Sequence, residues 1–145
     1  MEEELLEMVS SIVISKEKMN LLLEESKKSE KEFGALLFGR IEGNKAIVHL
    51  IKLLRYSERS TTHFIADPIF LMESFSEAEK MGLELVGIFH SHPAPPKPSA
   101  SDLRYMELNP VVWLIVDNTN LTVGAYVLEK GGLRQVGIEV IKNFS

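Results

Sequence analysis

An almost continuously apolar stretch, LELVGIFHSH at residues 83–92, most constrains what this chain can fold into. A strand that exposes one face alternates apolar and polar side chains, whereas a strand covered on both faces does not. The stretch therefore predicts a central strand with other side chains packed on both of its faces. Segments with helical apolar spacing precede and follow it, so we expect an α/β fold in which helices pack on a mixed β-sheet.

Caps, turns and apolar spacing divide the chain into alternating helices and strands. Helices are expected at 2–9, from a cap at Ser15 to about Lys28, from a cap at Asp67 to Gly82, and from about Asp102. Strands are expected at 11–15, 32–41, 45–54, 62–67, 83–92, 111–116, 121–129 and 133–141. The turn at 42–44 should join the second and third of these as a hairpin. We expect one domain over residues 1–145, with residues 1–10 as an extra N-terminal helix.

The apolar spacing of two helices predicts which of their faces are buried. In the helix after Ser15, the inner stripe consists of Met19, Leu22, Leu23 and Ser26. In the helix after Asp67, it consists of Phe70, Leu71, Phe75, Ala78 and Met81. The aromatic residues Phe64 and Trp113 are also expected in the core.

Composition excludes several classes of function. A chain of 145 residues with 45% hydrophobic and 26% charged residues has the make-up of an ordinary globular domain. A net charge of −5 argues against nucleic acid as a partner. Without cysteine, the chain has no disulfide, no thiolate metal ligand and no cysteine nucleophile. The acidic N-terminus resembles no signal peptide, and no stretch reaches transmembrane length, so we expect a cytoplasmic protein without a membrane partner.

The end of the central strand carries side chains that could bind a metal ion. His90 and His92 are two residues apart, so both point to the same face of the strand. Four prolines restrict the loop that follows, and it returns at Ser99, three residues before Asp102. If Ser99 caps a helix, Asp102 lies in its first turn and can point back to the strand end. Two imidazoles and one carboxylate, with one position left to water, form the ligand set of a catalytic zinc site.

A second interpretation of the same residues needs no metal. Ser99 and Asp102 also have the spacing of a capping box, and a histidine pair at a strand end is a weak signal by itself. Glu32, beside Lys31, would be read from its neighbours alone as a solvated charge. From local spacing, the metal site and the helix cap both remain open.

The motifs taken together resemble a known family. HSHP followed by a proline-rich loop and PSASD is similar to the JAMM motif of the MPN+ zinc metalloproteases, which reads His-x-His-Pro, a loop, then Ser-x-x-Asp. Residues 32–39, EFGALLFG, resemble the family's early strand, Glu-x-x-small-Leu-Leu-x-Gly. FIADP and VWLIVDNTNLTVGAYVL also resemble prokaryotic members, so the resemblance covers about residues 11–130. Nine residues separate His92 from Asp102, where the family usually has ten, which shortens the loop by one residue.

The resemblance implies an MPN fold, which is a cytidine deaminase-like fold, and a role for each motif residue. His90, His92 and Asp102 would hold one Zn²⁺ per chain. Glu32 would act as general base and acid, with Glu30 as the fallback. Ser99 would donate a hydrogen bond to the oxyanion, with Ser101 as the fallback.

The resemblance also implies a class of substrate. Members typically cleave the bond between the C-terminal Gly-Gly of a ubiquitin-like or small archaeal modifier protein and a lysine, so conjugates of such modifiers are the expected partners. Such a Gly-Gly tail offers no side chains, so we expect it to bind as an added strand at a sheet edge, beside residues 55–64 and the 93–98 loop. A homodimer is the oligomeric state considered.

Two alternative functions and several weaker residues complete the sequence-based hypotheses. The alternatives are release of a sulfur-carrier ubiquitin-like protein from an adduct, and a non-catalytic MPN scaffold or RadC-like protein. RadC-like sequences usually have Asn between the histidines, where this chain has Ser91.

Five further residues are weaker candidates for the site. They are His49, as a packed or surface histidine, His63, near the cleft, and Arg55, Arg59 and Lys97, as solvated charges.

Overall fold

The structure, a computed structural model, describes residues 3–29, 32–54 and 68–143. Its helices are α1 (Glu3–Met8), α2 (Lys16–Lys28), α3 (Pro68–Lys80) and α4 (Ala100–Leu108). Its strands are β1 (Ser11–Ser15), β2 (Phe33–Glu42), β3 (Lys45–Leu53), β4 (Glu84–His92), β5 (Val112–Asp117), β6 (Thr122–Glu129) and β7 (Gly132–Ile141). These elements follow the sequence prediction closely, except that α4 begins two residues before Asp102. The predicted strand at 62–67, with the Asp67 cap, His63 and Phe64, lies outside the described residues.

The described strands close into a barrel in the order β1-β3-β2-β4-β5-β6-β7. The parallel pairs are β1 with β3, β1 with β7, and β4 with β5, and the remaining neighbours are antiparallel. The mixed sheet is therefore confirmed. Its closure was not predicted, because it depends on β1, a fully buried strand of five residues that bridges β3 and β7.

Strand β4 is central, as its apolar run predicts. It pairs with β2 on one side and β5 on the other. Val86 and Phe89 belong to the main core inside the sheet, whereas Ile88 packs against two smaller clusters outside it. The strand is thus covered on both faces.

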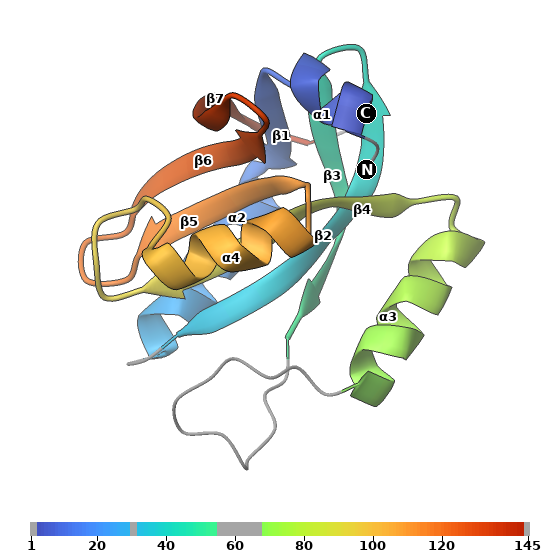
Figure 1. The fold of residues 1–145 in the computed structure, drawn as a ribbon. Helices are drawn as coiled ribbons and strands as arrows, with labels where there is room; N and C mark the ends of the chain where they lie inside the picture. The colour runs from blue at the N-terminus through green and yellow to red at the C-terminus, as the bar shows by residue number, and fades with distance from the viewer. Residues whose placement is uncertain (1–2, 30–31, 55–67, 144–145) are drawn as a thin grey trace.

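The core has one large cluster and two satellites. The large cluster joins side chains of all seven described strands with Leu6 of α1 and Met19 and Leu22 of α2. Because side chains alternate along a strand, neighbours of these residues point outward and pack under α3 and α4. The cluster under α3 contains Leu36, Phe38, Leu54 and Ala78, and the one under α4 contains Met106, Val111, Trp113 and Ile115. Figure 1 shows α3 and α4 as separate helices outside the barrel.

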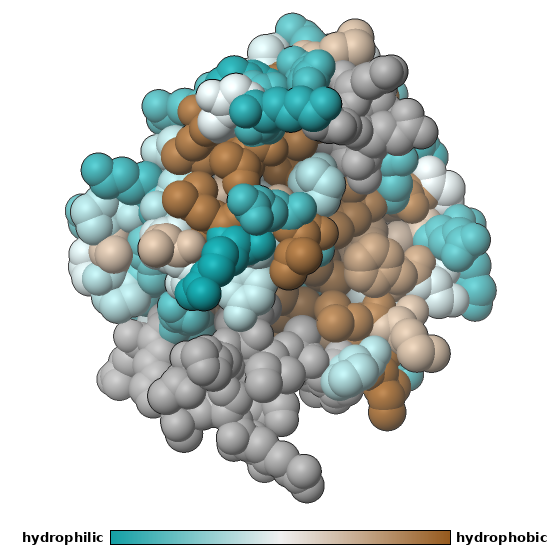
Figure 2. All heavy atoms as spheres, viewed as in Figure 1, coloured by the Kyte–Doolittle hydropathy of each residue, from teal (hydrophilic) through white to brown (hydrophobic). Residues whose placement is uncertain are grey.

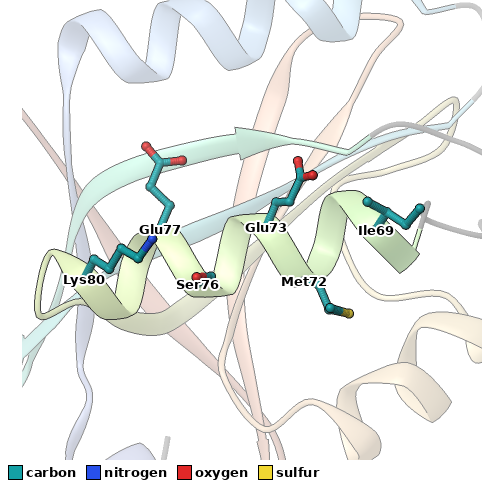
Figure 3. A pocket seen from close by; sticks show the side chains of 6 residues that line it. All are labelled: Ile69, Met72, Glu73, Ser76, Glu77 and Lys80. Carbon is teal, nitrogen blue, oxygen red and sulfur yellow. The ribbon is translucent and has the colours of Figure 1, made fainter.

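The buried face of α3 differs in part from the prediction. Of the predicted stripe, Ala78 is buried and Phe70 and Leu71 pack against the cluster under the helix, whereas Phe75 and Met81 are 44% and 50% exposed. Ser74, which was not predicted, is buried. Small side chains let the helix lie close to the sheet, and Phe75 touches Phe38 only edge-on, with ring centroids 5.1 Å apart. The outer face of α3 carries a shallow hollow (Figure 3), lined by Ile69, Met72, Glu73, Ser76, Glu77 and Lys80.

Polar contacts connect β7 to β1, to β3 and to the residue that follows α1. Glu139 of β7 accepts a hydrogen bond from Ser11 of β1 at 2.6 Å and forms an ion pair with Lys45 of β3 at 3.0 Å. The Ser11 hydroxyl and the Lys45 ammonium hold the pKa of Glu139 below its usual value. Arg134 of β7 donates to the carbonyl of Val9, after α1, at 2.8 Å. These contacts join segments that lie far apart in the sequence.

Within residues 3–29, 32–54 and 68–143, no helix combines the length and the apolar character needed to cross a membrane.

Candidate active site

The two histidines of HSHP are buried side by side at the end of β4. His90 and His92 are 9% and 6% exposed, and their ring centroids lie 5.3 Å apart. His90 is opposite Gly34 of β2 and Ile115 of β5, and His92 is opposite Asp117 of β5. Pairing on both sides of β4 therefore fixes the backbone that carries both rings.

The first turn of α4 brings Asp102 to the histidines. Ser99 caps the helix, with its Oγ accepting from the Asp102 N–H at 3.1 Å and its N–H donating to Asp102 Oδ2 at 2.9 Å. The other carboxylate oxygen, Oδ1, lies 3.0 Å from His90 Nδ1, and Oδ2 lies 3.8 Å from His92 Nε2. The capping box and the histidine–carboxylate cluster are therefore both present, and they use the same aspartate.

The surroundings of Asp102 stabilise its ionised form. Burial alone would raise the pKa of this carboxyl. The hydrogen bonds from His90 and from the Ser99 N–H, together with the charge of His90, outweigh burial and hold the pKa of Asp102 below its usual value. Asp102 is thus an anion placed against two imidazoles.

Glu32 lies at the same place, although its neighbours in the sequence suggested a solvated charge. It directly precedes β2, where Phe33 pairs with Ser91 of β4. Its Oε2 is 3.8 Å from His90 Nε2, and its side chain is 51% exposed. A half-exposed carboxylate beside buried histidines can exchange a proton with a molecule bound between them. Glu30, the fallback, lies outside the described residues.

The types of donor atom at the site, imidazole nitrogens and carboxylate oxygens, suit a divalent cation. Both ring nitrogens of His92 are buried and find no hydrogen-bond partner among the described residues, which is unusual for buried polar atoms. As the side chains stand, no three His, Asp or Glu residues of the described segments hold their donor atoms in the arrangement of a bound ion. Asp102 instead accepts a hydrogen bond from His90 Nδ1. Binding an ion would replace that hydrogen bond and would give one ring nitrogen of His92 a partner.

A cleft of about 680 Å³ extends from these residues. Its polar end includes Glu32, His90, Ser101 and Asp102. Its apolar part contains Leu36, Leu54, Leu71, Ile88 and Trp113, and Figure 2 shows apolar side chains gathered between α4 and α3. Ser101 lines the cleft, and its Oγ is 3.2 Å from Ser99 Oγ, so the two serines form one hydroxyl pair. The cleft can hold an extended apolar or backbone segment next to the reactive groups.

The proline-rich loop rests on Gly124 of β6. A Cβ at this position would lie 2.4 Å from the Pro96 carbonyl oxygen and 2.8 Å from the Tyr126 ring, closer than real Cβ atoms approach. Only glycine lets the loop that links His92 to Ser99 lie this close to β6. Sequence reasoning read Gly124 as a strand residue and missed this contact.

We expect Gly124→Ala to destabilise the protein by about 1–3 kcal/mol, because the added methyl group must displace the loop backbone. Chemical denaturation measures the change in the free energy of unfolding. Gly131→Ala is the matched control, since apart from its chain neighbours no atom of the described residues lies within 4 Å of its Cβ position. Equal effects of the two substitutions would contradict a steric role for Gly124.

The comparison with known proteins decides the family. A family model described as prokaryotic homologues of the JAB domain matches residues 18–128. This chain belongs to that family. The predicted resemblance to prokaryotic JAMM proteins is therefore confirmed, and so is the mixed α/β MPN fold.

Named relatives and solved structures agree with this membership. A desampylase from Pyrococcus furiosus is 34% identical over 132 residues, covering 90% of this chain and 91% of the relative. A probable TtuB-protein conjugate cleaving protease from Thermus thermophilus is 34% identical over 63 residues, 43% of each chain. A solution structure from Desulfitobacterium hafniense superposes with a TM-score of 0.79 at 26% identity, covering 92% of this chain and 95% of that one. A protein from Salinibacter ruber, with a TM-score of 0.62 at 22% identity and 91% coverage of both chains, shares the fold.

Two of the weaker candidates lie within the described residues, and neither lines the cleft. His49 lies in β3 and does not line the cleft, and Lys97 is exposed in the proline-rich loop, as expected of a solvated charge. Arg55, Arg59 and His63 lie outside the described residues.

Proposed function

We propose that this chain is a zinc-dependent isopeptidase that hydrolyses the bond between the C-terminal Gly-Gly of a ubiquitin-like or small archaeal modifier protein and a lysine side chain. The observation that carries the proposal is the convergence of Glu32, His90, His92 and Asp102, of which Glu32, His90 and Asp102 line a cleft. The family membership and the 34% identity to a desampylase along nearly the whole chain support the same activity.

His90, His92 and Asp102 would hold the zinc ion. The two imidazoles and the ionised carboxylate supply three ligands, and the unpartnered ring nitrogens of His92 are available without breaking another hydrogen bond. When bound at such a site, zinc lowers the pKa of its water to about 7 and polarises the carbonyl that is attacked. Four protein ligands would close a zinc site, so a fourth position remains for chemistry.

Glu32 and Ser99 would handle the proton and the developing charge. The Glu32 carboxylate accepts a proton from the attacking water and then delivers it to the lysine amine as the C–N bond breaks. The Ser99 hydroxyl donates a hydrogen bond to the carbonyl oxygen as it gains negative charge. Ser101 lies in the cleft beside Ser99 and is the alternative donor.

The modifier tail would enter along β3. In the described part of the chain, β3 pairs with β1 only at residues 45–47, whereas Val48 and residues 50–53 pair with β2. The strand ends beside the site, because the Leu54 N–H donates to the Gly34 carbonyl, and Gly34 is opposite His90. Leu54 itself lines the cleft. A tail added to this edge would exchange main-chain hydrogen bonds with β3 and lead into the cleft.

Two matched conjugates test the proposal. We expect the enzyme to release lysine from a modifier ending in Gly-Gly, and to lose about 10-fold or more of this rate when the final residue is Val, since a side chain there meets the cleft wall. Mass spectrometry of the products locates the cut. Equal hydrolysis of both tails, or cleavage at unrelated peptide bonds, would show a general peptidase instead.

The alternatives are separated by the same assay. A non-catalytic scaffold would leave both conjugates intact, although the presence and convergence of the motif residues argue against one. Release of a sulfur-carrier protein would use the same residues, and an adduct of such a protein in the substrate panel distinguishes the two.

A further inference from the structure

The turn between β5 and β6 contacts both of the segments that meet at the site. The backbone N–H of Asn118 donates to the His92 carbonyl at 3.0 Å, so the turn holds the end of β4. The side-chain Nδ2 of the same residue donates to the Ser29 carbonyl at 3.1 Å. One residue therefore connects the strand that carries the histidines to the end of α2.

Ser29 lies three residues before Glu32 and forms the C-cap of α2. On the other side of Glu32, Phe33 pairs with Ser91 of β4. Contacts on both sides of Glu32, at Ser29 and at Phe33, therefore connect its neighbours to the HSH segment, residues 90–92. We call these two contacts the anchors. The anchor at Ser29 is a single hydrogen bond between residues 89 positions apart in the sequence.

The turn is well fixed by its own hydrogen bonds. Asp117 Oδ1 accepts from the Thr119 N–H at 2.9 Å and from the Thr119 hydroxyl at 2.6 Å. The Leu121 N–H donates to the Asp117 carbonyl at 2.7 Å. Asp117 in turn is opposite His92 in the register of β4 and β5. The turn therefore provides a rigid support for the Asn118 side chain.

We propose that Asn118 is a positioning residue for Glu32: its side-chain amide holds the end of α2 at Ser29, three residues before Glu32, against the histidine end of β4. The proposal rests on the proposed function for the role of Glu32. It assigns a part in the reaction to the turn at residues 117–120.

Two Asn→Asp substitutions in the same turn test this hydrogen bond. Asn118→Asp replaces the NH₂ donor by an acceptor that repels the Ser29 carbonyl, and it leaves the backbone bond to His92. Asn120→Asp is the matched control, because Asn120 Oδ1 only accepts, from the Thr122 N–H and hydroxyl, and a carboxylate keeps both bonds. Charge, size and location thus change equally in the two variants.

For Asn118→Asp we expect a kcat about 10-fold lower, a KM within about twofold of wild type and an unchanged zinc content, since a small misplacement of a catalytic group lowers the rate steeply. Asn120→Asp should match wild type in all three. In the Glu32→Gln background, Asn118→Asp should lower kcat no further, because the effect passes through Glu32. Independent, additive losses would overturn the proposal.

Hydrogen exchange in the metal-free protein tests the anchor without any assay of activity. Peptides spanning residues 26–35 should exchange faster in Asn118→Asp than in Asn120→Asp or wild type. If wild type cleaves no conjugate, the proposed function is wrong. The exchange experiment still tests whether Asn118 holds Ser29, because it does not depend on activity. Equal exchange in all three proteins would show that Asn118 does not hold the segment.

Discussion

Replacing Glu32 by Gln should lower kcat for a Gly-Gly conjugate by about 100-fold or more, the usual scale for loss of a general base. The amide has nearly the shape of the carboxylate but cannot accept the proton of the attacking water. Glu32 is half-exposed and lies outside the proposed ligand set, so the zinc content and the free energy of unfolding should stay near those of wild type.

Glu24→Gln provides the control for this prediction. Glu24 is an exposed residue of α2, so the variant loses the same charge without touching the cleft, and it should turn over normally. Steady-state kinetics and metal analysis of both variants give the comparison. Near-normal turnover by Glu32→Gln would move the role to Glu30 or remove it from this segment.

Replacing His92 by Ala should abolish stoichiometric zinc and with it the hydrolysis of conjugates. Wild type should contain about one zinc per chain, since three protein ligands and a water match a catalytic site. Both ring nitrogens of His92 lack a hydrogen-bond partner among the described residues. Removal of this ring would leave the proposed site with only His90 and Asp102 as protein ligands.

Metal analysis after purification in zinc-containing buffer measures the loss, and circular dichroism checks that the fold persists. His49→Ala is the matched control, because this histidine of β3 does not line the cleft and its removal should leave zinc in place. Full zinc occupancy in a His90→Ala/His92→Ala double variant would rule out the site.

Much of the site follows from local rules that a sequence displays directly. The side chains of His90 and His92 share a face because strand side chains alternate, and Ser99 meets Asp102 because a capping box joins positions three apart. The Ser15 cap and the buried stripe of α2 follow from the same short-range rules. The resemblance to a family added Glu32, which its own neighbours had suggested to be a solvated charge.

The exposed face of α3 shows where such rules stop. Phe75 and Met81 belong to the predicted stripe yet are exposed, whereas Ser74, outside that stripe, is buried beside Ala78. Helical periodicity indicates that one face is apolar, but the neighbouring strands decide which rotation of the helix packs best. The residue spacing within α3 does not show the shape of the strand surface on which the helix packs.

By itself, then, the sequence determined the elements, the order of the motifs and the chemistry of their side chains. Only the tertiary structure closed the barrel through β1, placed Glu32 3.8 Å from His90, and set Gly124 and Asn118 against the loop and segment that they support. These contacts join residues separated by tens of positions. Their geometry depends on strand register and on packing across the whole sheet, which no local propensity encodes.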